Sequence, residues 1–199
     1  MIEIRIHGRG GQGAVFACSM LARALFEEGR WVQAFPHFGV ERRGAPVAAF
    51  VRFDERPIEL RCHIYHPDYV VILDPTLAGL PSTIQGLKPG GGVLVNSPCG
   101  PAEFSHFQHC RVATVDASSI ALKYKLGSIA SPIVNTAILG AFARFTGIVS
   151  LDSILGAVLE IIKRRTDDNI AAVRESFDKA VLPEDDRTLV GPARDHGEI

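Results

Sequence analysis

Four glycines interrupt the chain near its N-terminus, in the run Gly8-Arg9-Gly10-Gly11-Gln12-Gly13. Gly8, Gly10 and Gly13 have the spacing of dinucleotide-binding loops, where glycines let the backbone turn, approach a phosphate and pack a helix closely on a strand. Backbone N–H groups at the start of the following helix attract anions. The run therefore predicts a loop in which Arg9, Gln12 and the backbone amides contact a phosphate or another polar group of a cofactor. The simpler alternative is that the glycines only form a tight crossover and a packing surface for another chain.

A nicotinamide dinucleotide site also requires an acidic residue about 20 residues beyond the glycines, where it holds the ribose hydroxyls. The corresponding segment, residues 31–37, contains no carboxylate. Arg30 lies at the start of the predicted strand, where it is poorly placed to bind a 2′-phosphate. These residues argue against a stand-alone dinucleotide-dependent oxidoreductase, which we keep as an alternative of a different class.

A second candidate segment, residues 35–46, contains Glu41, Arg42 and Arg43 between glycines, together with two phenylalanines. Adjacent arginines point in different directions and suit contacts with carboxylates or phosphates. Aromatic residues beside arginines are typical of protein interfaces, although a solvated loop with paired charges is the simpler alternative. We predict that this segment and the glycine loop face the same side and form an interface, with Arg42 and Arg43 as its anchors or as a source of positive potential for phosphates.

Isolated polar residues are weaker candidates. Asp74 and Asp116 end predicted strands, where ligands of α/β proteins bind, but capping or turn roles explain them equally well. His37 is interpreted as a hydrogen-bonding loop residue and Asn135 as a hydrogen-bonding residue between helices. The cysteines at positions 18, 62, 99 and 110 include no Cys-x-x-Cys pair, and Cys18 is expected in the core. We therefore predict no catalytic residue and no metal site in this chain.

The elements that must position these residues alternate between strands and helices. Hydrophobic periodicity predicts strands over 2–7, 31–35, 47–53, 69–73, 93–96 and 111–116, a hairpin arm over 56–61, and helices over 14–28, 77–87, 118–124, 132–145, 151–164 and 167–180. The apolar run 69–73 is typical of a parallel sheet. The pattern predicts an α/β, Rossmann-like fold: a mostly parallel sheet flanked by helices, with a helical C-terminal third. We expect one domain over 1–182 and a mobile polar tail over 183–199.

Composition excludes several classes of function. The 199 residues carry 21 basic and 22 acidic side chains, a formal charge of −1, which provides neither a nucleic-acid footprint nor a polybasic membrane patch. The uninterrupted apolar runs are shorter than the ~20 residues of a membrane span, and the first seven residues do not resemble a signal sequence. We therefore expect a cytoplasmic chain that binds neither nucleic acid nor membrane.

Taken together, the glycine run and residues 33–36 and 38–46 resemble the gamma subunit of 2-oxoacid:ferredoxin oxidoreductases, of the pyruvate synthase (pyruvate:ferredoxin oxidoreductase) type. Further matching segments follow in the same order, at 74–77, 132–137, 139–142 and 146–151. Each segment alone is unspecific, but the set is specific and spans residues 2–182. Gamma subunits of branched-chain or aryl 2-oxoacid enzymes fit the same pattern.

The resemblance implies an enzyme that oxidatively decarboxylates a 2-oxoacid with thiamine diphosphate, sends electrons through iron–sulfur clusters to ferredoxin, and transfers the acyl group to coenzyme A. Thiamine diphosphate, magnesium and the clusters are implied to belong to alpha, beta and delta partner subunits, with no cofactor bound by this chain alone. The gamma chain is implied to pack on the catalytic subunits and to help shape the coenzyme A region. Residues 8–13 would then be a coenzyme A or interface loop, and Glu41, Arg42 and Arg43 interface residues. A pure assembly module, without contact to coenzyme A, remains the alternative.

Overall fold

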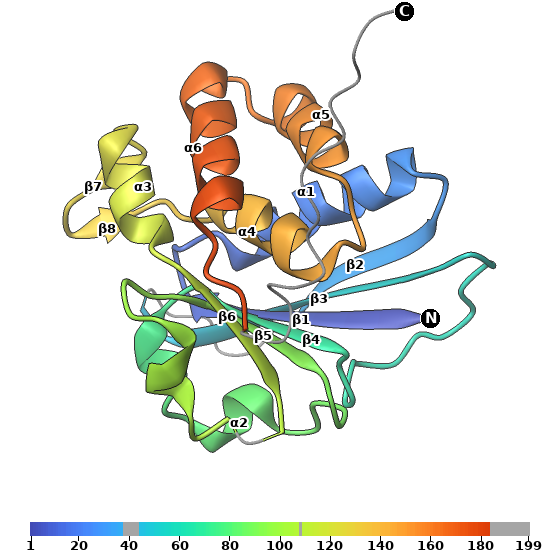
Figure 1. Cartoon of the computed structure of the whole chain (residues 1–199). Coiled ribbons are helices and arrows are strands. Elements are labelled where there is room, and N and C mark those ends of the chain that lie inside the picture. The colour runs from blue at the N-terminus through green and yellow to red at the C-terminus, as the bar shows by residue number, and fades with distance from the viewer. Residues whose placement is uncertain (38–43, 108, 184–199) are drawn as a thin grey trace, which may run out of the picture.

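The computed structural model describes residues 1–37, 44–107 and 109–183 (Figure 1). Within these residues, one sheet has six strands in the order β2-β3-β1-β4-β5-β6. The strands are β1 (Ile2–Arg9), β2 (Trp31–His37), β3 (Pro46–Asp54), β4 (Tyr69–Ile72), β5 (Gly92–Asn96) and β6 (Arg111–Val115), with a separate hairpin of β7 (Gly127–Ser128) and β8 (Ser131–Pro132). The helices are α1 (Ala14–Glu27), α2 (Pro81–Ile84), α3 (Ala117–Lys123), α4 (Ala137–Thr146), α5 (Leu151–Ile161) and α6 (Thr166–Lys179), with short 3-10 helices η1 (Pro75–Leu77) and η2 (Pro101–Phe104).

The sheet is mixed but mostly parallel, as predicted. β1 is parallel to β4, and β5 and β6 continue in the same direction. β3 lies between β1 and β2 and is antiparallel to both. The connection from β1 through α1 to β2 therefore crosses over β3. For this reason β1 and β2 are not adjacent, as they would be in a dinucleotide-type βαβ unit.

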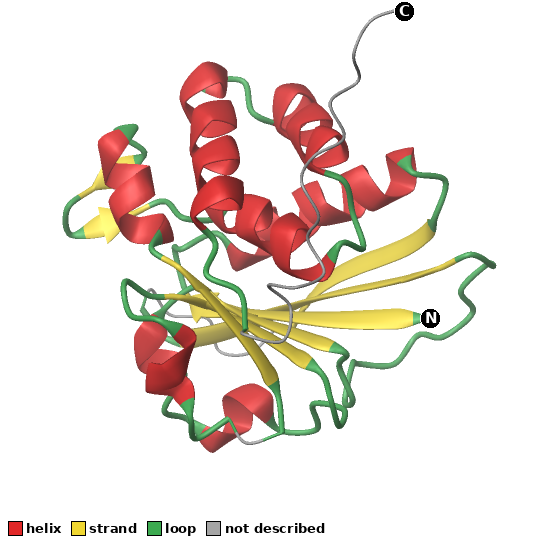
Figure 2. Ribbon diagram, in the orientation of Figure 1, coloured by secondary structure: helices red, strands yellow, loops and turns green. Residues whose placement is uncertain are grey.

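Helices cover both faces of the sheet (Figure 2). The larger layer contains α1, α4, α5 and α6 (Figure 1), and its core includes Ile4, Ile6, Val71 and Leu94 from the strands. The opposite face of β4, β5 and β6 is covered by short helices that include η1 and η2. Its buried residues form a separate cluster that contains Val70, Ile72, Val93, Val95 and Phe104. Burial on both faces explains the apolar runs Val70–Ile72 in β4 and Val93–Val95 in β5.

The predicted helix over 132–145 begins later than expected. Ser131 and Pro132 form β8, which pairs with β7, and α4 begins only at Ala137. A proline is compatible with extended backbone as well as with the first turn of a helix. Gly127 allows the hairpin to form because its φ is +88°, a left-handed conformation that glycine adopts without steric cost.

Three further boundaries differ from the prediction. Residues 56–61 form no strand, and the Gln33 side chain donates to the carbonyl of Ile58 (3.0 Å). The predicted helix over 77–87 is divided into η1 and α2, because Pro81 begins a new helix. α6 begins at Thr166, one residue earlier than predicted, and Arg165 is its N-cap. Of the predicted tail, only Pro183 lies within the described residues. None of the helices in the described ranges combines the length and the apolar character needed to cross a membrane.

Candidate functional site

The glycine loop joins the end of β1 to the start of α1. Gly11 and Gly13 have φ values of +100° and +82°, in the region that residues with a Cβ rarely adopt. Gly8 is constrained by space: a Cβ there would lie 3.3 Å from both Gln12 Oε1 and Leu73 Cδ1. Backbone conformation therefore favours glycine at two positions, and at Gly8 a larger side chain would press on Gln12 and Leu73.

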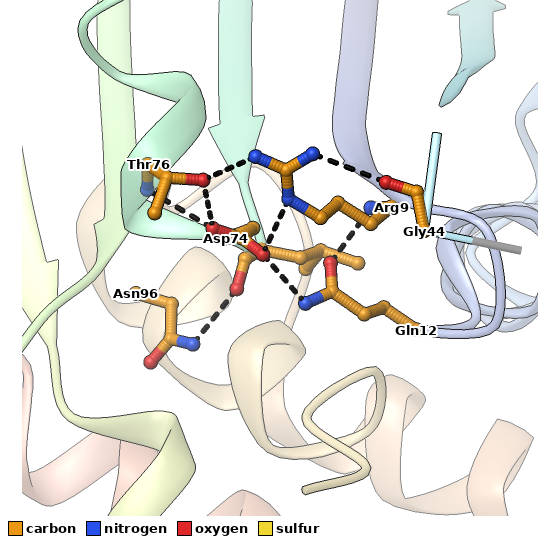
Figure 3. Close-up of polar contacts among 7 residues, drawn as sticks. Arg9, Gln12, Gly44, Asp74, Thr76 and Asn96 are labelled. Atoms are coloured by element: carbon orange, nitrogen blue, oxygen red, sulfur yellow. Dashed lines mark hydrogen bonds and ion pairs between the residues drawn. The ribbon is translucent and has the colours of Figure 1, made fainter. Parts of the chain in front are cut away.

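Asp74, two residues after the end of β4, is the centre of a hydrogen-bond network with this loop (Figure 3). Its Oδ2 accepts hydrogen bonds from Arg9 Nε (3.1 Å) and Gln12 Nε2 (3.0 Å). Its Oδ1 accepts from the backbone N–H of Thr76 (3.0 Å) and from Thr76 Oγ1 (2.6 Å). Burial acts to raise the pKa of Asp74, but the donors of Thr76 and Gln12 and the charge of Arg9 together lower it below its ordinary value. The carboxylate is therefore charged at neutral pH and offsets the charge of Arg9.

Arg9 and Gln12 are already engaged by the protein itself. Arg9 Nη2 donates to Thr76 Oγ1 (2.6 Å) and Nη1 donates to the carbonyl of Gly44 (3.1 Å). Gln12 Oε1 accepts from the backbone N–H of Arg9 (2.7 Å). Both side chains therefore fix the shape of the loop, which their types and spacing did not indicate. Their contact with a cofactor stays a prediction.

The end of the second segment, residues 44–46, lies beside the glycine loop. The N–H of Gly10 donates to the carbonyl of Ala45 (2.9 Å), and the N–H of Gly44 donates to the carbonyl of Gly10 (3.1 Å). Glu41, Arg42 and Arg43 lie outside the described residues, so their interface role stays a prediction. His37 is the last residue of β2 and not a loop residue.

Asn135 reaches the glycine loop from a distant part of the chain. It precedes α4, and its side chain is only 7% exposed. A Cβ on Gly13 would lie 2.4 Å from Asn135 Nδ2, so the amide lies directly against that glycine. No described residue forms a hydrogen bond with its buried Oδ1. The prediction that Asn135 forms a hydrogen bond between helices was wrong, because the residue precedes α4 and contacts the glycine loop. A contact between segments so far apart in the chain leaves no local pattern in the sequence.

The remaining polar and cysteine residues near the strand ends and in the core have structural roles. Asp116 caps α3 by accepting from the N–H of Ser119 (2.9 Å), which confirms the capping alternative. Asn96, at the end of β5, donates to the carbonyl of Leu73 (2.8 Å) and thereby ties β5 to the strand end that carries Asp74 (Figure 3). Cys18 is buried, and burial raises the pKa of its thiol, as expected for a core residue. In the part of the chain that the structure describes, no group of three or more His, Cys, Asp or Glu residues could hold a metal ion.

Comparison with known proteins places this geometry in a family. Residues 3–179 match the family model described as pyruvate ferredoxin/flavodoxin oxidoreductase. A Thermococcus kodakarensis protein named "Pyruvate/ketoisovalerate oxidoreductases common subunit gamma" is 49% identical over 92% of this chain and 100% of its own length. "Pyruvate synthase subunit PorC" of Methanocaldococcus jannaschii is 48% identical over 88% of this chain and 94% of its own.

Solved structures agree with the sequence relatives. The pyruvate oxidoreductase subunit PORC of Thermotoga maritima is similar to this chain with a TM-score of 0.77 and 38% identity, over 90% of this chain and 96% of that one. The 2-oxoglutarate:ferredoxin oxidoreductase of Magnetococcus marinus shares the fold, with a TM-score of 0.66 and 22% identity, over 89% of this chain and 30% of that one. The family expected from the glycine loop and the segments after it is thus confirmed: the chain belongs to the pyruvate ferredoxin/flavodoxin oxidoreductase family, in the group of its gamma subunits.

Proposed function

We propose that this gamma subunit assembles with alpha, beta and delta subunits into a cytoplasmic 2-oxoacid:ferredoxin oxidoreductase that forms an acyl-coenzyme A from a 2-oxoacid, with pyruvate as the substrate. The observation that carries the proposal is the near-full-length similarity, at 48–49% identity, to gamma and PorC subunits of pyruvate-type enzymes. In this assignment thiamine diphosphate, magnesium and the iron–sulfur clusters are held by the partner subunits, and ferredoxin takes the electrons from the assembled complex.

The role of this chain in that complex is support and not bond-making. Asp74 is the carboxylate of the network around the glycine loop, and its two oxygens already accept from Arg9, Gln12 and Thr76. A carboxylate occupied in this way orients its neighbours and is not available as a general base. The hydrogen bonds of Asp74 therefore support a role in which this chain presents a rigid loop to the subunits that carry out the reaction.

The surface around the loop has the composition of an interface. Val15 and Phe16, in the first turn of α1, are 43% and 41% exposed, and Ile133, close to Asn135 in the chain, is 43% exposed. Exposed apolar side chains that surround a polar loop mark protein interaction sites. We assign this surface (residues 8–16, 44–45 and 133) to the catalytic subunits, and we propose that Glu41, Arg42 and Arg43 contribute to the same interface. Coenzyme A would then bind where this chain meets them.

Purification of the complex tests the assignment. Co-expression with the alpha, beta and delta subunits should give a stable assembly that reduces ferredoxin with pyruvate and coenzyme A, and a panel of branched-chain and aryl 2-oxoacids should be poorer substrates. The double variant Arg42→Ala/Arg43→Ala should weaken assembly or raise the apparent KM for coenzyme A. Unchanged assembly together with unchanged kinetics would contradict the interface role of the two arginines.

Calorimetry of the isolated chain with NAD and NADP should show no binding, and saturable binding would favour the dinucleotide-dependent alternative.

A further inference from the structure

The hairpin of β7 and β8 projects from the molecule beside α3 and carries an apolar side chain at its tip (Figure 1). Ser128 pairs with Ser131, so Ile129 and Ala130 form a two-residue turn. Turns of this length favour Asn, Asp and Gly. Ile129 is 90% exposed, more than any other large apolar side chain in the described residues. Isolated apolar side chains are common on protein surfaces, so the tip indicates a contact only together with the charges around it.

Positive charges gather at the base of this hairpin. Lys125 lies two residues before β7, and Lys163, Arg164 and Arg165 lie in the loop between α5 and α6. All four side chains are exposed. The two loops meet, because Arg165 Nη1 donates to the carbonyl of Lys125 (2.6 Å). We name residues 125, 127–133 and 163–165 the hairpin patch.

Most of the charges in the hairpin patch have no counter-ion in the described part of the chain. Arg165 is paired with Asp168 (2.9 Å), whereas no described carboxylate forms an ion pair with the other three basic side chains. Asp167, in the first turn of α6, is an exposed carboxylate that offsets part of this charge. The patch therefore keeps a net positive charge on a chain whose formal charge is −1.

Arg165 holds the two loops of the patch in one shape. Its Nε donates to Asp168 (2.9 Å), and its Nη2 donates to the carbonyl of Tyr124 (3.3 Å), beside the bond of Nη1 to Lys125. Lys125 and Arg165 both have a left-handed backbone conformation, with φ values of +53° and +55°, which residues with a Cβ adopt at an energetic cost. The hairpin patch is therefore pre-organised, which lowers the entropy that a partner loses on binding.

The occupant of such a surface has to offer an apolar pocket with carboxylates around it. A second copy of this chain does not, because a symmetric contact would place the same positive charges against each other. Anionic lipid would attract the basic side chains, but one isoleucine buries too little apolar area in a bilayer to anchor the chain. A folded, acidic protein surface suits both the tip and the base of the hairpin.

We propose that the hairpin patch docks into an apolar pocket with an acidic rim on a neighbouring subunit of the assembled oxidoreductase. Ile129 is the buried anchor of this contact, and Lys125 and Arg164 face the carboxylates. The inference rests on the proposed function for the existence of that subunit. It extends the surface around the glycine loop, because Ile133 belongs to that surface and also closes the hairpin, where its N–H donates to the carbonyl of Leu126 (3.0 Å).

Dilution of the complex co-expressed with the alpha, beta and delta subunits tests the docking. Lys125→Glu/Arg164→Glu should weaken the binding of this chain about tenfold or more at low salt, and the loss should shrink at about 0.5 M salt, which screens exposed charges. Ile129→Ser should weaken binding about tenfold at both salt concentrations, because it removes an apolar anchor.

Matched controls lie in the loop between β3 and β4, on the opposite side of the molecule (Figure 1). Arg56→Glu/Arg61→Glu reverses two charges on exposed residues of that loop, and Leu60→Ser removes an apolar side chain that is 47% exposed. Both controls should assemble as the wild type does. The hairpin variants change only exposed side chains, so their Tm should stay close to that of the wild type.

Photocrosslinking gives a second measurement that does not depend on affinity. Replacement of Ile129 by p-benzoyl-phenylalanine should link this chain to one partner subunit when the complex is irradiated, and the same replacement of Leu60 should not. Equal assembly of the wild type and both hairpin variants, without a crosslink from position 129, would overturn the docking. Loss of binding to phosphatidylserine vesicles with unchanged assembly would overturn it in favour of a lipid contact. Failure of the proposed function would instead appear in the wild type, as a chain that assembles with no partner.

Discussion

Asp74 is the residue on which the geometry of the glycine loop depends. It accepts four hydrogen bonds, two of them from the side chains of Arg9 and Gln12 and two from Thr76. Hydrogen bonds to a charged acceptor are the stronger ones in proteins, because the low dielectric of a partly buried site screens them weakly. The loop is therefore fixed by a carboxylate from another strand end, and the glycines only permit its shape.

Asp74→Asn tests this dependence with almost no change of volume. The asparagine presents an NH₂ group to at least one of the donors now bound, so we expect unfolding free energy to fall by about 2 kcal/mol and Tm to fall by roughly 4–8 °C. Thermal unfolding and hydrogen exchange of residues 8–13 measure the two effects. Asp178→Asn, an exposed position on α6, is the control and should change stability by less than about 0.5 kcal/mol. Equal stability of both variants would show that the network does not hold the loop.

At the scale of elements, α4 and α6 approach each other closely within the helical layer. A Cβ on Gly140 would lie 2.0 Å from the carbonyl oxygen of Val173 and 3.0 Å from the backbone nitrogen of Phe177. Only glycine allows the two backbones to come so near. This approach fixes the position of α4, and with it the position of Asn135 just before the helix.

A pair of glycine substitutions should have opposite effects on stability. Gly140→Ala forces α4 and α6 apart, and overpacking of this kind costs about 1–3 kcal/mol. Gly156 lies on α5, where a Cβ would meet no atom within 4 Å, so Gly156→Ala should stabilise the protein by about 0.5–1 kcal/mol through helix propensity. Urea unfolding of both variants gives the comparison. If Gly140→Ala were also stabilising, the close approach would not constrain the layer.

A cluster of charges ties α6 to α3 and predicts a sensitivity to acid. Glu175 accepts from Lys123 Nζ (2.6 Å) and Tyr124 Oη (2.7 Å), and Lys179 Nζ lies 2.7 Å from its other oxygen. The donors of Lys123, Lys179 and Tyr124 lower the pKa of Glu175 from about 4.5 to about 2. Because the pKa is lower in the folded state, the stabilisation is fully present above the ordinary pKa and is lost as the pH falls towards 2.

Glu175→Gln should therefore lower Tm by a few degrees at neutral pH and flatten the fall of Tm between about pH 4.5 and pH 2. Glu55→Gln, at a side chain that is 80% exposed in its pair with Arg30, should leave the profile close to that of the wild type, because exposed pairs contribute little. The measurement is Tm as a function of pH for the three proteins. Parallel profiles for the wild type and Glu175→Gln would contradict the assignment.

For the whole molecule, the sequence predicted what depends on local patterns and missed what depends on distant contacts. The alternation in β1 and the apolar runs of β4 and β5 appeared as local signals, and so did the segments that identify the family. The insertion of β3 between β1 and β2 did not, because strand order is set by packing and not by periodicity. For the same reason, the sequence could not decide whether Asp74 caps a helix or binds a ligand. The contact of Asn135 with Gly13 was not predicted either.

The exposed apolar residues around the loop carry the last prediction, which concerns assembly. Phe16 and Phe26 lie on the same helix and are 41% and 59% exposed, but only Phe16 stands beside the glycine loop. If the partner subunits cover that surface, Phe16→Ser should weaken their binding by about 2 kcal/mol, roughly 30-fold, as truncation of a buried interface aromatic does. Phe26→Ser should change it less than about twofold. Co-purification at decreasing concentration measures both, and a similar loss for the two variants would place the interface elsewhere on α1.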